Sequence, residues 1–163
     1  MCAHTRKILL LLCVTAFSLP LHAGTALLFF GGSHHWGCDQ SRYSCDYHEF
    51  NPGIGVEVAK QTDNWGKVFA RVGFYRDSYG DQANFFSLGL RQDWALSQPE
   101  WRLGIGIMAG QSSGRYNRTI GLPFAYIARK NLAVELGLAP AELSDQNFKS
   151  KYIGTLNFRW DLD

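Results

Sequence analysis

The stretch KVFARVGFYRD, residues 67–77, decides the fold that this sequence predicts. Four apolar side chains fall on one face, at Val68, Ala70, Val72 and Phe74, and the other face carries Lys67, Arg71, Tyr75 and Asp77. A period of two is the pattern of a β-strand whose two faces meet different surroundings. The pattern predicts a strand over residues 66–77, long enough to cross a bilayer when tilted.

The same alternation recurs along the chain and predicts eight strands, near residues 25–35, 53–61, 66–77, 83–94, 101–112, 119–128, 131–140 and 152–160. Period alone does not say which face points inward, because a soluble lipocalin-like barrel would bury the apolar face and a membrane barrel would expose it to lipid. The polar face favours the membrane barrel, since it repeatedly carries charges that could pair inside one closed lumen: Glu57, Arg71, Arg91, Arg102, Glu135 and Arg159. The sequence therefore predicts an all-β, eight-stranded antiparallel transmembrane β-barrel of outer-membrane type, with the soluble barrel as the alternative.

The lengths of the connections alternate as well. The links QTDN, SQPE and ARKN are short, whereas residues 36–52, 113–118 and 141–151 form longer connections. Outer-membrane barrels have short periplasmic turns and longer external loops. If the first strand leaves the periplasm, the first and third strands end at the same outer rim.

The N-terminal residues predict a signal peptide over 1–23, which leaves residues 24–163 as the barrel domain. Arg6 and Lys7 precede the apolar run ILLLLCVTAFSL, Pro20 interrupts it, and cleavage is expected after Ala23 or Ala26. Such export predicts localisation in the bacterial outer membrane. A lipid anchor on Cys13 is the alternative, but the preceding leucine fits a lipoprotein signal poorly.

Two cysteines remain after removal of the signal peptide, Cys38 and Cys45, and an exported protein can join them in a small loop-closing disulfide. Zinc is the alternative for this pair, because His34, His35 and His48 are nearby, yet the spacing matches no standard zinc module. We therefore predict no metal. The net charge of +2 is mild and the basic residues are scattered, so nucleic acid is not predicted as a partner.

Residues suited to acyl transfer meet at the predicted outer rim. His34 and His35 end the first strand, and Asp77 and Ser78 end the third. A histidine, a carboxylate and a hydroxyl together can supply a base, its orienting partner and a nucleophile. The alternative is turn chemistry, because Asp77-Ser78 before Gly80 is an ordinary turn sequence. Successive strand residues face opposite sides, so only one of the two histidines can face the lumen.

The chain resembles the PagP-type lipid A palmitoyltransferases, small outer-membrane barrels that move a palmitoyl chain from a phospholipid onto lipid A. The resemblance covers roughly residues 32–160 and rests on the order and spacing of short motifs. They are Ser33-His34, Tyr47-His48-Glu49, Gly53-Ile54-Gly55, Tyr75-Arg76-Asp77-Ser78-Tyr79, Leu88-Gly89-Leu90, Leu103-Gly104-Ile105-Gly106, Ala109-Gly110, Leu122-Pro123, Ala139-Pro140 and the final aromatic strand.

The resemblance implies an acyltransferase that works without a cofactor, as a monomer, on phospholipid and lipid A. It assigns the catalytic positions to His34, Asp77 and Ser78, and it makes Gly89 the floor of an interior slot that measures acyl length; the alternative for Gly89 is a packing glycine. The resemblance also implies that prolines mark gaps in the barrel wall through which lipid enters sideways, here Pro52, Pro123 and Pro140. Simple strand termination is the alternative.

Two other functions remain open for such a barrel. One is a non-enzymatic barrel whose external loops bind surfaces. The other is a lipid A deacylase, whose residues would lie on the lipid-facing side.

Overall fold

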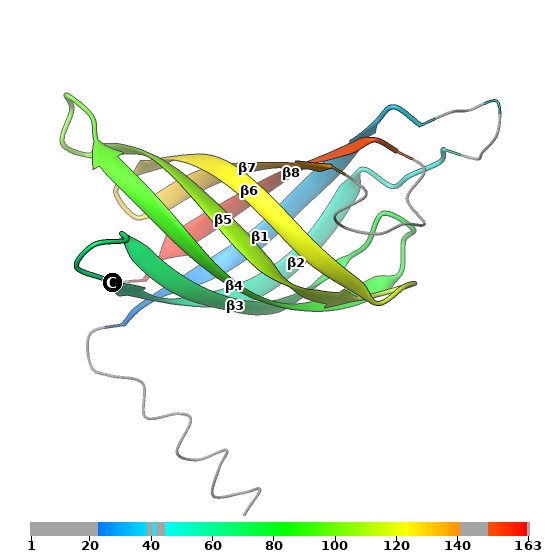
Figure 1. Cartoon of the computed structure of the whole chain (residues 1–163), viewed down its shortest axis with the longest axis horizontal. Helices are drawn as coiled ribbons and strands as arrows, with labels where there is room; N and C mark the ends of the chain where they lie inside the picture. The colour runs from blue at the N-terminus through cyan, green and yellow to red at the C-terminus, as the bar shows by residue number, and fades with distance from the viewer. Residues whose placement is uncertain (1–22, 39–40, 42–44, 141–149, 163) are drawn as a thin grey trace, which may run out of the picture.

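The structure is a closed barrel of eight antiparallel strands (Figure 1). It is a computed structural model that describes residues 23–38, 41, 45–140 and 150–162. The strands are β1 (Gly24–Trp36), β2 (Phe50–Gln61), β3 (Lys67–Arg76), β4 (Gln82–Ala95), β5 (Trp101–Ser113), β6 (Arg118–Arg129), β7 (Leu132–Pro140) and β8 (Tyr152–Asp161). Each strand pairs with its neighbour in sequence, and β8 pairs with β1. The predicted all-β, eight-stranded antiparallel barrel is confirmed, and it is a fold of the outer-membrane type.

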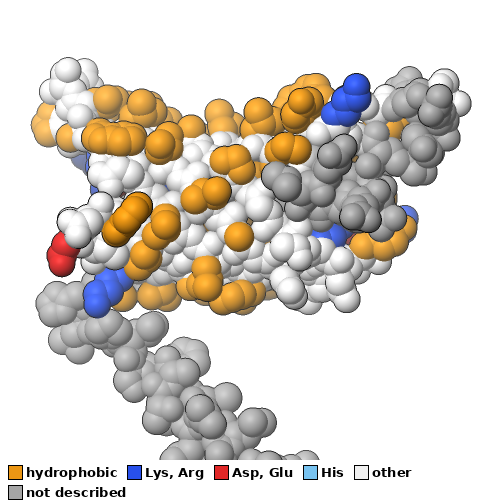
Figure 2. All heavy atoms as spheres, viewed as in Figure 1, with side chains coloured by type: hydrophobic (Ala, Val, Ile, Leu, Met, Phe, Trp, Pro, Cys, Tyr) orange, Lys and Arg blue, Asp and Glu red, His pale blue; other side chains and the backbone are white. Residues whose placement is uncertain are grey.

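The outer wall is apolar and the lumen is polar. The aliphatic side chains of the alternating strands lie outside, where Val72 is 52% exposed, Ile107 57% and Leu136 61%. Figure 2 shows apolar side chains spread over the visible wall, with charged ones near its two ends. This arrangement is the reverse of a lipocalin-like barrel, whose apolar faces would point inward, and it is the one that membrane barrels adopt. None of the described residues forms a helix long and apolar enough to span a membrane.

Buried charges pair with one another in the lumen, as the sequence predicts. Glu57 accepts hydrogen bonds from Arg71 at 2.7 Å and from Arg91 at 2.6 Å, and Glu135 accepts from Arg71 at 2.9 Å and from Arg159 at 3.1 Å. Because every carboxylate faces two guanidinium groups at hydrogen-bonding distance, the charges compensate one another although they are shielded from water. Arg102, predicted with this set, instead lies near the strand ends, 3.5 Å from Asp93.

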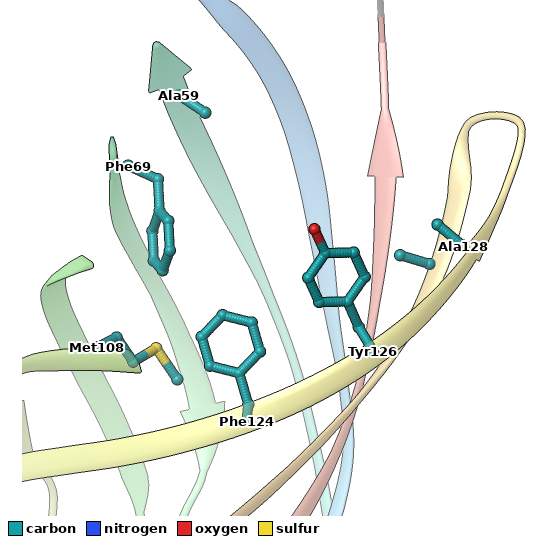
Figure 3. Close-up of a cluster of buried hydrophobic side chains, with 7 residues drawn as sticks. Ala59, Phe69, Met108, Phe124, Tyr126 and Ala128 are labelled. Carbon is teal, nitrogen blue, oxygen red and sulfur yellow. The ribbon is translucent and has the colours of Figure 1, made fainter. Parts of the chain in front are cut away.

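A layer of buried rings and methionine lies next to this network. Phe69, Met108, Phe124 and Tyr126 pack together with three buried alanines (Figure 3). The Arg71 guanidinium lies 4.6 Å from the Phe69 ring centre and 5.3 Å from that of Phe124, so the ionic network and the aromatic layer share a contact. Together they fill this part of the lumen with packed side chains.

The two ends of the barrel differ. The terminal end, as we call it, holds both ends of the described barrel chain and the three short turns β2–β3, β4–β5 and β6–β7; the opposite loop end holds the other four connections (Figure 1). Exposed aromatic side chains lie near both ends, Trp36, Phe50, Tyr116 and Tyr152 at the loop end and Trp65, Trp94 and Trp160 at the terminal end. Such paired girdles are a feature of membrane barrels.

Most of the predicted signal peptide, including Cys13, lies outside the described residues. Strand β1 begins at Gly24, and Ala26 is buried in it between Glu57 of β2 and Asp161 of β8. Cleavage after Ala26 would therefore remove three residues that are paired in the barrel, whereas cleavage after Ala23 would leave the strand intact.

Candidate active site

A β-bulge in β1 determines which histidine enters the lumen. Before the bulge the inward residues are even-numbered, such as Leu28 and Phe30. The register toward both β2 and β8 then shifts between Phe30 and Gly32. An extra residue in one strand reverses the alternation that follows it. Beyond the bulge it is Ser33 and His35 that face inward.

His35 and Ser78 form a histidine–serine pair in contact at the loop end. The Nε2 atom of His35 lies 2.9 Å from the Ser78 hydroxyl, which is 8% exposed. On the other side of the ring, Nδ1 lies 3.2 Å from the hydroxyl of Ser150, just before β8. When Nδ1 carries the proton and donates it to Ser150, Nε2 is an acceptor aimed at Ser78. This is the geometry of a serine nucleophile and its general base.

A second hydroxyl, that of Ser33, continues the polar chain. It donates to Oδ1 of the buried Asn51 at 2.7 Å and lies 3.1 Å from the Ser78 hydroxyl. Because the single Ser33 proton goes to Asn51, the Ser33 oxygen can only accept from Ser78. Ser78 thus has two acceptors for its proton, and the nearer one is His35. The amide of Asn51 is itself fixed, since its NH₂ group donates to the His48 carbonyl oxygen at 3.1 Å.

Asp77 is buried beside Ser78 but does not orient the histidine. One carboxylate oxygen accepts the backbone N–H groups of Tyr79 and Asp81, both at 2.9 Å, and the other accepts that of Arg115 at 3.0 Å. Asp77 therefore shapes the β3–β4 turn and ties it to the β5–β6 connection. The turn closes through Gly80, whose φ of 84° favours glycine. The position beside the histidine that the predicted triad gave to Asp77 is occupied by Ser150.

His34 lies on the outer wall and not with Ser78. Its side chain is half exposed, its Nδ1 contacts the Glu49 carboxylate, and its ring packs edge-on against Trp36 at 4.6 Å. We predicted that His34, Asp77 and Ser78 act together, and the structure corrects this for two of the three residues. The bulge turns His34 outward, and backbone amides engage the Asp77 carboxylate. Of the three predicted catalytic residues, Ser78 alone lies in the polar chain.

The β1–β2 connection packs over the histidine. The predicted disulfide between Cys38 and Cys45 is present in it, so these two sulfurs are not available as thiolate ligands of zinc. No three His, Cys, Asp or Glu side chains gather as metal ligands within the part of the chain that the structure describes. Tyr47, two residues beyond the disulfide, stacks on His35 with ring centres 4.1 Å apart. The backbone N–H of His48 donates to the Ser78 carbonyl oxygen at 2.9 Å, which joins this connection to the β3–β4 turn.

An apolar cavity of about 150 Å³ lies in the lumen below the polar chain. Ser33, His35 and Ser78 line it at the loop end, together with the guanidinium-bearing side chain of Arg118 from β6. Most of the remaining lining is apolar and includes Phe30, Phe85, Ile120, Leu122, Ala139 and Ile153. The Ser78 hydroxyl thus stands at the wall of a pocket whose lining suits a hydrocarbon.

Gly89 is not the floor of this cavity. It does not line the cavity, and a Cβ at this position would lie against the Phe69 ring and the Ile107 carbonyl oxygen. The structure thus agrees with the alternative, a packing glycine in a crowded lumen. The cavity ends instead on Met108 and Arg71, which both line it and whose Sδ and Nη1 atoms lie 3.8 Å apart.

The three predicted prolines lie where strand pairing is broken. The β6–β7 ladder joins residues 124–129 to residues 132–137, and no pairing is recorded between the described residues 118–123 and 138–140. Pro123 and Pro140 fall in the stretches where β6 and β7 do not pair, although Pro123 pairs with β5 and Pro140 with β8. A Cβ on Gly121 would meet open space. Pro52 lies where the β1–β2 register shifts. The interrupted pairing agrees with the predicted sites of sideways lipid entry and equally with strand termination.

Sequence reasoning assigned the catalytic role to His34 while leaving open that His35 faces the lumen, and it missed four further residues of the site, Ser33, Asn51, Ser150 and Arg118. The glycine pair at residues 31–32 is the signal that could have corrected the histidine, because glycine inside a strand often marks a bulge. The other four have no local signal, since Ser33 and Asn51 meet only through strand pairing and Ser150 reaches His35 across 115 residues of sequence. In comparisons with known proteins, no family model matches the chain and no curated protein matches it significantly.

Proposed function

We propose that this protein is an outer-membrane acyltransferase that moves an acyl chain from a phospholipid to lipid A. The observation that carries the proposal is the Ser78 hydroxyl 2.9 Å from Nε2 of His35, at the wall of an apolar cavity. A nucleophile, a base and a hydrocarbon pocket are the three parts that acyl transfer between lipids requires. The resemblance to the palmitoyltransferases supplies the substrates, and the longer connections of the loop end suit the outer surface, where lipid A is found.

The reaction starts with the phospholipid ester at Ser78. His35 takes the Ser78 proton at Nε2 while Oγ forms a bond to the acyl carbonyl carbon. The bond from that carbon to the glycerol oxygen then breaks, and the glycerol oxygen takes the proton from His35, which leaves a lysophospholipid and an acyl-serine. In the second half a lipid A hydroxyl gives its proton to His35 and attacks the acyl carbon. Ser78 leaves and regains its proton, so atoms and charges balance.

Arg118 supplies positive charge to the same cavity. Its guanidinium lies 5.2 Å from the Tyr79 ring centre and 5.7 Å from that of Tyr116, two rings that hold it at the loop end. The carbonyl oxygen of the ester becomes an anion when Ser78 attacks, and a fixed cation stabilises such an oxyanion in a water-poor site. We assign this role to Arg118.

Mass spectrometry of lipid A tests the proposal. Expression in a Gram-negative strain that lacks such an activity is expected to add the mass of one acyl chain to lipid A. Ser78→Ala removes the nucleophile and is expected to abolish the addition, whereas Ser113→Ala, outside the cavity lining, is expected to keep it. A loss of acyl mass would point to deacylation, and no change with a correctly folded barrel would point to a binding role.

Because Met108 forms the cavity floor, its replacement is expected to change the acyl-chain length that the protein prefers. Met108→Ala removes three side-chain atoms from the floor and is expected to lengthen the preferred acyl chain by roughly two or three methylene groups, because the space is open to the cavity above. Competition between donors of different chain length measures the preference. Ile107→Ala is the matched control, since Ile107 is the adjacent residue and points outward. An unchanged preference in Met108→Ala would show that chain length is measured elsewhere.

A further inference from the structure

A second cavity, of about 320 Å³, lies at the terminal end of the barrel, opposite to Ser78. It differs from the first in being strongly polar. Four cationic side chains and two carboxylates contribute to its lining, namely Lys67, Arg91, Arg102 and Lys130 with Glu57 and Asp161. We call it the terminal cavity.

The two carboxylates of the terminal cavity are already bound to arginines. Both oxygens of Glu57 accept short hydrogen bonds, one from Arg71 and one from Arg91. Asp161 accepts from Nε of Arg159 at 2.9 Å, and its second oxygen lies 3.8 Å from Arg102. Each carboxylate therefore also neutralises an arginine that does not line the cavity, Arg71 or Arg159. The positive charge at the cavity is consequently only partly neutralised.

Lys67 and Arg91 are two cations that the fold brings together at the terminal cavity. They are direct partners across the β3–β4 ladder and both line the terminal cavity, and like charges opposite each other destabilise a sheet. Among the residues that the structure describes, none forms an ion pair with Lys67. Arg91 is 4% exposed, and although its Nη1 donates to Glu57, its Nε is buried without a hydrogen-bond partner. A buried guanidinium N–H that lacks an acceptor is costly, and an anion at the cavity would satisfy it.

We propose that the terminal cavity binds a phosphate group, held between Lys67 and Arg91. A tetrahedral oxyanion offers acceptors in several directions, so it can take the Arg91 Nε–H and the Lys67 ammonium together and relieve their repulsion. Arg102 adds a further guanidinium at the wall. The phosphate is either a free ion or the headgroup of a phospholipid at the membrane face next to this end. The proposal is independent of the acyltransferase proposal, because it concerns the opposite end of the barrel.

Thermal unfolding of the full barrel in dodecyl maltoside, which carries no phosphate, tests the site. Inorganic phosphate at millimolar concentration, compared with chloride at equal ionic strength, is expected to raise Tm by roughly 5 °C through binding to the folded state. Lys67→Gln is expected to weaken phosphate binding by about tenfold or more, as measured by calorimetric titration. Lys67→Arg keeps the charge and is expected to retain binding.

The matched control is Lys60→Gln, because Lys60 is an exposed lysine of neighbouring β2 that does not line the cavity. Barrels in vesicles of phosphatidylglycerol or of an uncharged galactolipid separate the two sources. Stabilisation by free phosphate in maltoside identifies the ion. Stabilisation seen only in phosphatidylglycerol, and lost in Lys67→Gln but not in Lys60→Gln, identifies the lipid headgroup. The proposal is overturned if neither phosphate source stabilises the wild type, or if Lys67→Gln responds as the wild type does.

Discussion

Replacing His35 by alanine is expected to lower acyl transfer by a factor of about 10² to 10⁴, the contribution that a positioned general base makes to a proton transfer. The Nε2 atom of His35 is the nearer acceptor of the Ser78 proton, and the Ser33 oxygen, the other one, is bound to Asn51. Without the imidazole the serine would attack as a neutral hydroxyl. The rate of acyl addition to lipid A, in barrels whose folding is checked by heat-modified migration on gels, measures the effect.

His34→Ala provides the matched control because it removes the same ring from the adjacent residue. His34 faces outward and contacts Glu49, so its loss is expected to change the rate by less than about threefold. The reverse result, activity lost in His34→Ala and kept in His35→Ala, would place the chemistry on the outer wall and contradict the lumenal site. Retention of activity in both variants would exclude His34 and His35 as the required base.

The strands could be predicted because alternation is a local property. Residues 67–77 already show which side chains share a face, and the structure confirms that Val72 lies outside and that Arg71 lies inside. The polar lumen could also be predicted from sequence, because charged residues recur on one face of the strands and buried charges need partners. Glu57 is an example: the two arginines that it binds lie 14 and 34 residues away in sequence.

The site could be predicted only in part because a single inserted residue changes every orientation after it. The bulge at residues 31–32 turns His35 inward where uninterrupted alternation from Leu28 would turn His34 inward. The role of Asp77 was hidden for another reason: its acceptors are engaged by backbone amides, and sequence does not record where a backbone N–H points. The cavity floor at Met108 could not be predicted either, because it depends on which inward side chains are long enough to meet across the lumen.

The largest effect on stability is expected from the buried ionic network. Glu57→Gln removes the charge that compensates two arginines, each less than 5% exposed, and is expected to lower the free energy of unfolding by about 3–5 kcal/mol. The loss is large because the guanidinium groups stay in the lumen after their partner is gone. Urea unfolding of barrels refolded in vesicles, followed by tryptophan fluorescence, measures it.

Glu100→Gln is the control for Glu57→Gln, because Glu100 is about half exposed and pairs with Arg129 and Lys130 at the surface; its loss is expected to cost less than about 1 kcal/mol. Equal costs for the two variants would mean that water reaches Glu57. The network also limits the cavity, since Arg71 binds Glu57 and lies 3.8 Å from Met108 Sδ. Glu57→Gln is therefore expected to loosen the floor as well as the barrel, so a destabilised variant that still transfers lipid should accept a wider range of chain lengths.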